Sequence, residues 1–147
     1  MQLALRDAGR PQAACAVLIS PWLDLSASRP SCRANDAYDY GQTSFLLEHA
    51  RVVARDLPLD DPRVSPLFAN LSGLAPLFVQ VGSAERLFDE SRELVHRARQ
   101  VGVLAELDIA AGMPHDPPLL ADYHPEAERA LQRLATALSR TAPGVSA

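Results

Sequence analysis

The sequence contains no lysine: all 14 basic residues are arginines, and they are scattered along the chain. The 18 acidic residues outnumber them and give a formal net charge of −4. Proteins that bind nucleic acid need a basic face, so this charge argues against a nucleic-acid partner. No apolar run approaches the ~20 residues that a transmembrane helix needs, so no membrane span is expected.

Cysteine is also scarce, since Cys15 and Cys32 are the two in the chain and cannot form a disulfide framework. Cys15 lies in a short apolar run, where a small buried hydrophobic residue is its simplest interpretation. The first residues lack the charged segment and apolar core of a secretory signal. Together these features favour a cytoplasmic location.

Several motifs that bring a cofactor, a metal or a nucleophile are missing. There is no glycine-rich dinucleotide or phosphate loop, and the four histidines do not have metal-ligand spacing. We therefore expect no metal site. Ser83, in Gly82-Ser83-Ala84-Glu85, lacks the second glycine of a Gly-x-Ser-x-Gly elbow and is interpreted as a turn or capping residue. Ser20 and Ser65 each precede proline and are interpreted as loop residues.

The chain does contain short apolar runs that alternate with amphipathic segments. Its 147 residues, 48% of them hydrophobic, fit one domain. Strands are predicted at 14–19, 76–81 and 103–109, and helices at 1–8, 43–55, 87–101 and 124–140. The run 14–19 is continuous, as in a strand buried on both faces, whereas the polar stretch 26–43 has no period and is interpreted as a loop. This order predicts the α/β class, with parallel strands joined by right-handed crossover helices.

Glu85 and His115 follow two of these predicted strands. Parallel strands that are joined by a crossover helix end at the same edge of the sheet, where ligands and chemistry collect. Each residue alone has an ordinary explanation: Glu85, like Asp89, suits the first turn of a helix, and His115 suits a solvated loop. Together they form a pair in which a carboxylate can orient an imidazole for general-base catalysis.

Other segments of the chain resemble a known family. Ser20-Pro21-Trp22-Leu23-Asp24-Leu25, the stretch Asp61-Pro62-Arg63-Val64-Ser65-Pro66-Leu67 and Leu71-Ser72-Gly73-Leu74-Ala75-Pro76 occur in that order. With Gly82-Ser83-Ala84-Glu85 and Met113-Pro114-His115, they resemble the C-terminal half of bacterial α/β-hydrolase esterases of the hormone-sensitive-lipase group. The resemblance implies a three-layer α/β-hydrolase fold, with residues 1–147 as the C-terminal portion of a single domain.

The resemblance also implies a function. Glu85 stands at the position of the acid in a Ser–Asp/Glu–His triad, His115 at the position of the histidine, and Asp89 at an acidic position that supports the acid loop. The chain departs from the common pattern in having Glu85-Arg86-Leu87 for Asp-Pro-Leu, and Asp116-Pro117-Pro118 directly after the histidine. The implied substrate is a carboxylic ester of short or medium acyl chain, and no cofactor is implied.

The family's oxyanion segment and nucleophile elbow have no counterpart in this sequence. By the resemblance, Met1 falls in the helix that follows the elbow, so we expect the chain alone to be inactive. Two alternatives are a non-catalytic remnant that pairs with another chain and a small flavodoxin-like binding domain. Because the strand 14–19 carries no charge that would protect an open edge, we also expect association through it.

Overall fold

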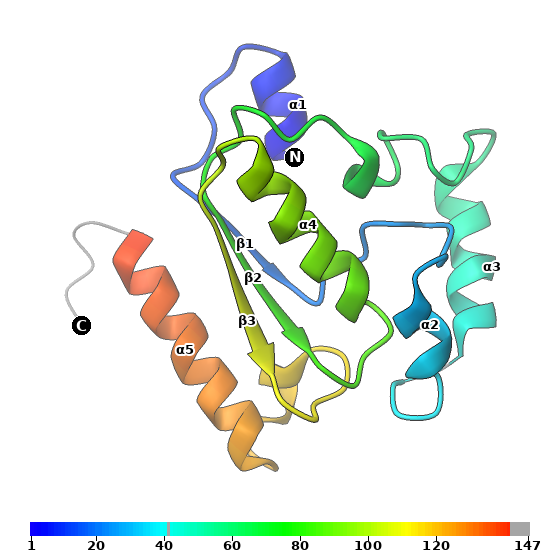
Figure 1. Ribbon diagram of the computed structural model, residues 1–147, viewed down its shortest axis with the longest axis vertical. Helices are drawn as coiled ribbons and strands as arrows, with labels where there is room; N and C mark the ends of the chain where they lie inside the picture. Colours follow the sequence, from blue (N-terminus) through cyan, green and yellow to red (C-terminus); the bar gives the residue numbers. More distant parts are fainter. Residues whose placement is uncertain (41, 142–147) are drawn as a thin grey trace.

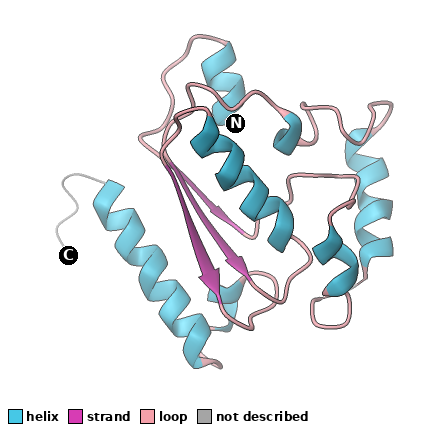
Figure 2. Cartoon of the chain, viewed as in Figure 1, coloured by secondary structure: helices cyan, strands magenta, loops and turns pink. Residues whose placement is uncertain are grey.

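The computed structural model describes residues 1–40 and 42–141. In this part of the chain a parallel sheet has the order β1-β2-β3, formed by β1 (Ala16–Ile19), β2 (Leu77–Gly82) and β3 (Ala105–Ala110). All three strands were predicted within two residues of these bounds. The α/β class with parallel strands is therefore confirmed (Figure 2).

The pairing of β2 with β3 sets the position of the residues that follow both strands. Their register runs from Leu77 opposite Ala105 to Gly82 opposite Ala110, so the two strands end level with each other. The connection between them is α4 (Phe88–Gln100), as the predicted crossover requires. Segments that leave β2 and β3 therefore start side by side at one edge.

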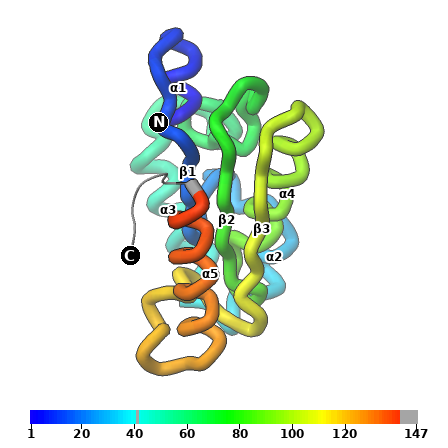
Figure 3. The backbone as a smooth tube through the Cα atoms, turned by 90° about the vertical axis from the view of Figure 1, so that its left-hand side faces the viewer, coloured from blue at the N-terminus to red at the C-terminus, as the bar shows by residue number. Residues whose placement is uncertain are grey.

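Two helices cover the opposite faces of the sheet and make three layers (Figures 1 and 3). On one face, Val79 packs with Leu94 and Val95 of α4. On the other face, Phe78 packs with Leu134 of α5 (Pro125–Thr141). Neighbouring residues of a strand point to opposite faces, which explains how β2 contributes to both clusters. Each fully buried aliphatic side chain contributes ~1.5–3 kcal/mol.

The smaller elements lie outside the sheet: α1 (Gln2–Asp7), α2 (Pro30–Ala34), α3 (Thr43–Ala54), and the 3-10 turns η1 (Pro66–Phe68) and η2 (Pro117–Leu120). The interpretation of 26–43 as a loop was wrong at α2. This helix has five residues, with Pro30 at its first position, which is too short for a helical period to be visible in the sequence. Within the described residues, no helix has the length and apolarity to cross a membrane.

The predicted burial of the first strand on both faces was also wrong. The strand begins at Ala16, Cys15 before it is half-buried, and Ile19 is 37% exposed. The face of β1 is partly exposed because α5 lies mainly over β2 and β3. In the described part of the chain, β1 pairs with β2 on one side and with no strand on the other. The outer edge of β1 is therefore open.

Candidate active site

A close crossing of two backbone segments brings the acid and the histidine together. The turn after β3 passes over the end of β2, where Ala84 N donates to Met113 O at 3.0 Å. A Cβ atom on Gly82 would lie 2.2 Å from that same Met113 oxygen and 2.5 Å from Pro114 O, so a side chain at position 82 would collide with the turn. The glycine that ends the apolar run thus lets His115 reach Glu85.

The structure contains the predicted contact between Glu85 and His115. One carboxylate oxygen of Glu85, Oε2, lies 3.0 Å from Nδ1 of the His115 ring. The other, Oε1, accepts hydrogen bonds from Gly82 N at 2.7 Å and from the hydroxyl of Ser20 at 2.9 Å. The Glu85 side chain is fully buried, whereas 36% of the His115 side chain is exposed. The Nδ1 edge of the imidazole is therefore held by Glu85, and part of the ring is exposed.

The environment of the pair determines its protonation. Burial raises the pKa of Glu85, and its hydrogen bonds with His115, Ser20 and Gly82 oppose this effect. The pKa of His115 is raised chiefly by its hydrogen bond to Glu85, with further contributions from the negative charges of Asp116 and Asp39. With Nδ1–H donating to the carboxylate, Nε2 is the nitrogen that can accept a proton. This is the arrangement that a general base needs.

Ser20 is a site residue that the sequence interpretation missed. It follows β1, is buried, and has a positive φ of 41° that is uncommon for a residue with a side chain. Its hydroxyl donates to Glu85 Oε1 and accepts a hydrogen bond from Asp116 N at 3.0 Å. Ser20 therefore connects the acid to the segment that carries the histidine. Its position just after a strand of the same sheet was the available signal.

Asp89 contacts Ser31 and Arg92 rather than the histidine. Its Oδ2 atom accepts a hydrogen bond from Ser31 N at 2.9 Å, and its own backbone N–H donates to Ser31 Oγ at 3.1 Å. The same Ser31 hydroxyl donates to Arg86 O at 2.6 Å. Asp89 is thus linked through α2 to the residue that follows Glu85.

Ser83 and Ser65 have hydrogen-bond partners other than His115, and the other histidines lie at the surface. Ser83 Oγ accepts a hydrogen bond from Gly112 N at 2.8 Å and so belongs to the turn. Ser65 is buried, accepts from Leu25 N and donates to Leu59 O. The other three histidines are exposed, as predicted: His49, His96 and His124. The described residues include no cluster of three or more His, Cys, Asp or Glu side chains that could hold a metal.

The second nitrogen of the His115 ring has a carboxylate neighbour. Nε2 lies 3.5 Å from Asp116 Oδ2, and no hydroxyl or thiol in the described part of the chain is hydrogen-bonded to it. Asp116 itself has a positive φ of 52°, which its backbone bond to Ser20 holds in place. The pair thus consists of a carboxylate and an imidazole, and no hydroxyl or thiol among the described residues is hydrogen-bonded to Nε2.

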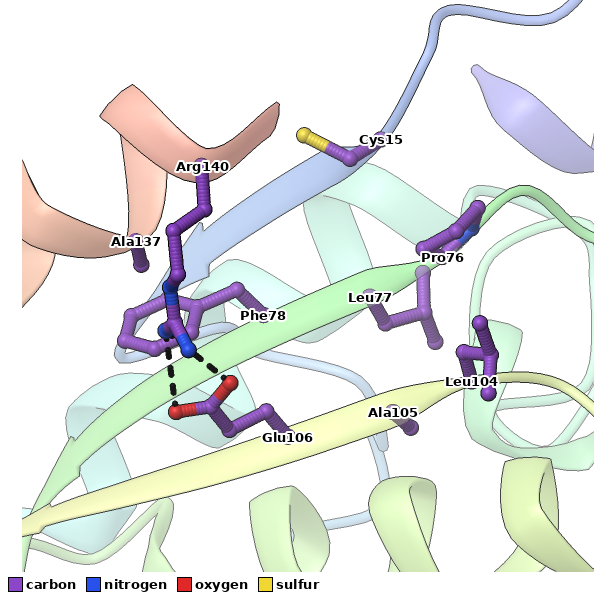
Figure 4. Close-up of a pocket in the computed structure, with 9 residues that line it drawn as sticks. All are labelled: Cys15, Pro76, Leu77, Phe78, Leu104, Ala105, Glu106, Ala137 and Arg140. Carbon is purple, nitrogen blue, oxygen red and sulfur yellow. Dashed lines mark hydrogen bonds and ion pairs between the residues drawn. The ribbon is translucent and has the colours of Figure 1, made fainter. Parts of the chain in front are cut away.

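A cavity of about 330 Å³ lies at the opposite end of the sheet, where β2 and β3 begin (Figure 4). Its walls include Leu77, Ala105 and the aliphatic part of Arg140, whose guanidinium pairs with Glu106 at 3.1 Å. Figure 4 shows the Cys15 side chain directed toward the last turns of α5. This cavity is separated from Glu85 and His115 by the length of the strands, so it has no part in their chemistry.

Comparison with known proteins identifies the fold family. A family model described as alpha/beta hydrolase fold matches residues 1–118. An acetyl-hydrolase of Streptomyces hygroscopicus is 39% identical over 150 aligned positions, which cover 96% of this chain and 47% of that protein. An esterase of Acinetobacter venetianus is 36% identical over 121 positions, which cover 81% of this chain and 40% of that protein.

Solved structures give the same result. A hormone-sensitive lipase from a metagenome library superposes with a TM-score of 0.90 and 30% identity, over 95% of this chain and 48% of that one. An esterase from the bacterial hormone-sensitive lipase family superposes with a TM-score of 0.90 and 35% identity over the same shares. The chain thus spans about half the length of the relatives it matches. It belongs to the α/β-hydrolase family and is similar to bacterial esterases of the hormone-sensitive-lipase group.

Proposed function

We propose that residues 1–147 are the C-terminal portion of a single α/β-hydrolase domain that hydrolyses carboxylic esters. In this proposal Glu85 is the acid and His115 the base of a serine triad. The observation that carries it is the 3.0 Å contact between Glu85 Oε2 and His115 Nδ1, at the carboxyl ends of adjacent parallel strands. Asp89 supports the acid segment through Ser31.

In the reaction, a serine hydroxyl from the part of the fold outside this chain attacks the ester carbonyl carbon. His115 Nε2 takes the hydroxyl proton as the Oγ–C bond forms, and Glu85 stabilises the resulting imidazolium. Backbone N–H groups, also outside this chain, stabilise the tetrahedral oxyanion. As the intermediate collapses, the bond between the carbonyl carbon and the alcohol oxygen breaks, the alcohol leaves with the proton from Nε2, and an acyl-serine remains. Water then attacks the acyl carbon while Nε2 takes its proton, and the bond to the serine Oγ breaks as Oγ takes that proton back, which releases the acid.

The substrate in this proposal is a small ester with a short or medium acyl chain. Relatives named esterase and acetyl-hydrolase support the class. The partly exposed ring of His115 supports an ester substrate as well. A proton-accepting nitrogen at the surface of this chain can reach a nucleophile and an ester that are placed against that surface.

A fusion enzyme tests this function. The N-terminal half of a bacterial esterase, including its Gly-x-Ser-x-Gly segment, is joined to Met1, and hydrolysis of p-nitrophenyl acetate is measured. We expect saturable turnover that His115→Ala abolishes and that His124→Ala, a change at an exposed histidine, leaves intact. A fusion with a cooperative thermal melt and no turnover would contradict the proposal.

We propose further that this chain by itself does not hydrolyse esters, because no nucleophile contacts His115 Nε2 in its described residues. The purified chain should leave p-nitrophenyl acetate unchanged above the buffer rate. Turnover that is saturable and lost in His115→Ala would show that another side chain acts as the nucleophile.

The open edge of β1 supports one more proposal, that the chain associates in solution. The strand β3 carries Glu106 and Asp108, which pair with arginines of α5, whereas β1 has no charged residue. Charges protect an edge from pairing, so the two edges differ in this respect. Light scattering after size exclusion should show a dimer or larger species. Ile19→Lys should lower the associated fraction more than Ile109→Lys does. A monodisperse wild-type monomer would contradict association.

A further inference from the structure

The segment from residue 35 to residue 40, which follows α2, packs against both loops of the site. Asn35 Nδ2 donates to Glu85 O at 2.8 Å, which fixes the backbone of the acid. Four residues later, Asp39 contacts both the loop after β2, at Arg86, and the loop after β3, at His115. No pattern in the sequence pointed to this segment, and the reaction proposed above does not use it.

Both carboxylate oxygens of Asp39 accept hydrogen bonds from backbone N–H groups. Oδ1 accepts a hydrogen bond from His115 N at 2.9 Å, and also one from Tyr40 N at 2.9 Å. Oδ2 accepts a hydrogen bond from Arg86 N at 2.9 Å. One side chain therefore joins the residue after the acid to the histidine itself.

The charge of Asp39 is buried and compensated. Its side chain is 2% exposed, and the Arg86 Nε atom lies 3.5 Å from Oδ2. The Arg86 side chain is 6% exposed; its guanidinium also donates to Tyr40 O and pairs with Asp36 at 3.4 Å. A buried carboxylate with this many partners holds a fixed position, because moving it would leave several polar groups unpaired.

Aspartate suits this position better than its isosteres. An asparagine has one acceptor oxygen and would place an NH₂ group either against the N–H of Arg86 or against those of His115 and Tyr40. The backbone donor at position 86 requires a residue other than proline, because a proline there would have no N–H to give to Asp39. Arg86 supplies both this N–H and the cation that neutralises Asp39.

We propose that Asp39 is a positioning residue that fixes the His115 ring against Glu85 by binding the backbone of both loops. The proposal rests on the acid–base pair of the proposed function and adds the group that sets its geometry. Asp39 touches neither the substrate nor the reacting nitrogen; it acts through the backbone of His115. Three carboxylates then surround His115: Glu85 at Nδ1, Asp116 beside Nε2, and Asp39 at its backbone N–H.

The test measures the protonation of the His115 ring by NMR in the full chain. Wild type is compared with Asp39→Asn and with Asp36→Asn, a matched change in the same segment at a carboxylate that shares the Arg86 contact and binds Thr43 but not the backbone of His115. We expect Asp39→Asn to lower the pKa of His115 and to shift the neutral ring from the Nδ1–H toward the Nε2–H tautomer. Asp36→Asn should leave the tautomer unchanged.

An unchanged tautomer and pKa in Asp39→Asn would overturn the inference. Glu85→Gln is measured alongside: if it leaves the ring unchanged, the acid–base pair itself fails, which is a separate result. If Asp39→Asn does not fold, hydrogen exchange in the wild-type chain decides. The Arg86 and His115 amides should then exchange as slowly as those within β2, and fast exchange at both would overturn the inference.

Discussion

A buried glutamate outside the site gives the sharpest prediction about stability. Glu90, in α4, is fully buried; its Oε1 accepts a hydrogen bond from Leu23 N at 2.6 Å, and its Oε2 has no partner in the described residues. Burial raises the pKa of Glu90 to about 8 from its ordinary value of 4.5, and the negative charge of Asp24 adds to this. At neutral pH the native protein therefore holds a proton on Glu90 that the unfolded chain releases.

The direction of the pH effect follows from this difference. Between pH 4.5 and about 8 the folded state binds the additional proton, so stability is fully present below 4.5 and is lost as the pH rises through 8. A tenfold change in proton affinity is worth ~1.4 kcal/mol, so the whole interval is on the order of 5 kcal/mol, as an upper bound. Glu90→Gln keeps the shape and an acceptor for Leu23 N but cannot ionise.

Urea unfolding followed by circular dichroism at pH 5, 7 and 9 measures the effect. The free energy of unfolding of wild type should fall toward pH 9 relative to that of Glu90→Gln, by at most ~1.4 kcal/mol per pH unit. Glu93→Gln, one turn along in α4 and at a partly exposed side chain, serves as the matched control and should follow wild type. Parallel curves for wild type and Glu90→Gln would refute the reasoning.

Two further substitutions test the scaffold of the site. Ser20→Ala removes the hydroxyl between Glu85 and Asp116 N and should lower the free energy of unfolding in urea by ~1–3 kcal/mol. Ser139→Ala, at an exposed serine, should lower it little, and equal losses in the two variants would contradict the role of Ser20. Gly82→Ala places a methyl 2.2 Å from Met113 O and should lower the free energy of unfolding by ~1–3 kcal/mol. It should also shift the NMR resonances of the His115 ring, and unchanged resonances would show that the turn does not depend on Gly82.

The sequence could predict much of the fold because the strands and long helices carry a clear period. The helix 43–55, the crossover 87–101 and the final helix 124–140 were confirmed to within one residue. The short helix α2 was not predicted, because five residues make barely more than one turn and show no repeating apolar face. The open edge of β1 was expected, whereas the exposure of its faces was not, since an apolar run does not tell which elements will cover it.

The acid and the histidine were within reach of sequence reasoning because both follow strands joined by one crossover. Ser20 follows β1 at the same edge, but its two hydrogen bonds join residues 65 and 96 positions away, and no local pattern contains that information. Asp39 lies in a polar segment without a period, and its role depends on how that segment folds over the loops. Such contacts are properties of the assembled structure.

We propose Glu85, and not Asp89, as the acid that acts on His115. The fusion enzyme described above tests it most directly, through kcat/KM on p-nitrophenyl acetate for Glu85→Gln and Asp89→Asn. Loss of the carboxylate that orients a catalytic histidine lowers kcat by about 10⁴-fold in a serine protease. We predict a loss of that order for Glu85→Gln. Asp89→Asn should retain most of the activity, because Asp89 binds Ser31 and not His115. A larger loss for Asp89→Asn than for Glu85→Gln would contradict the account.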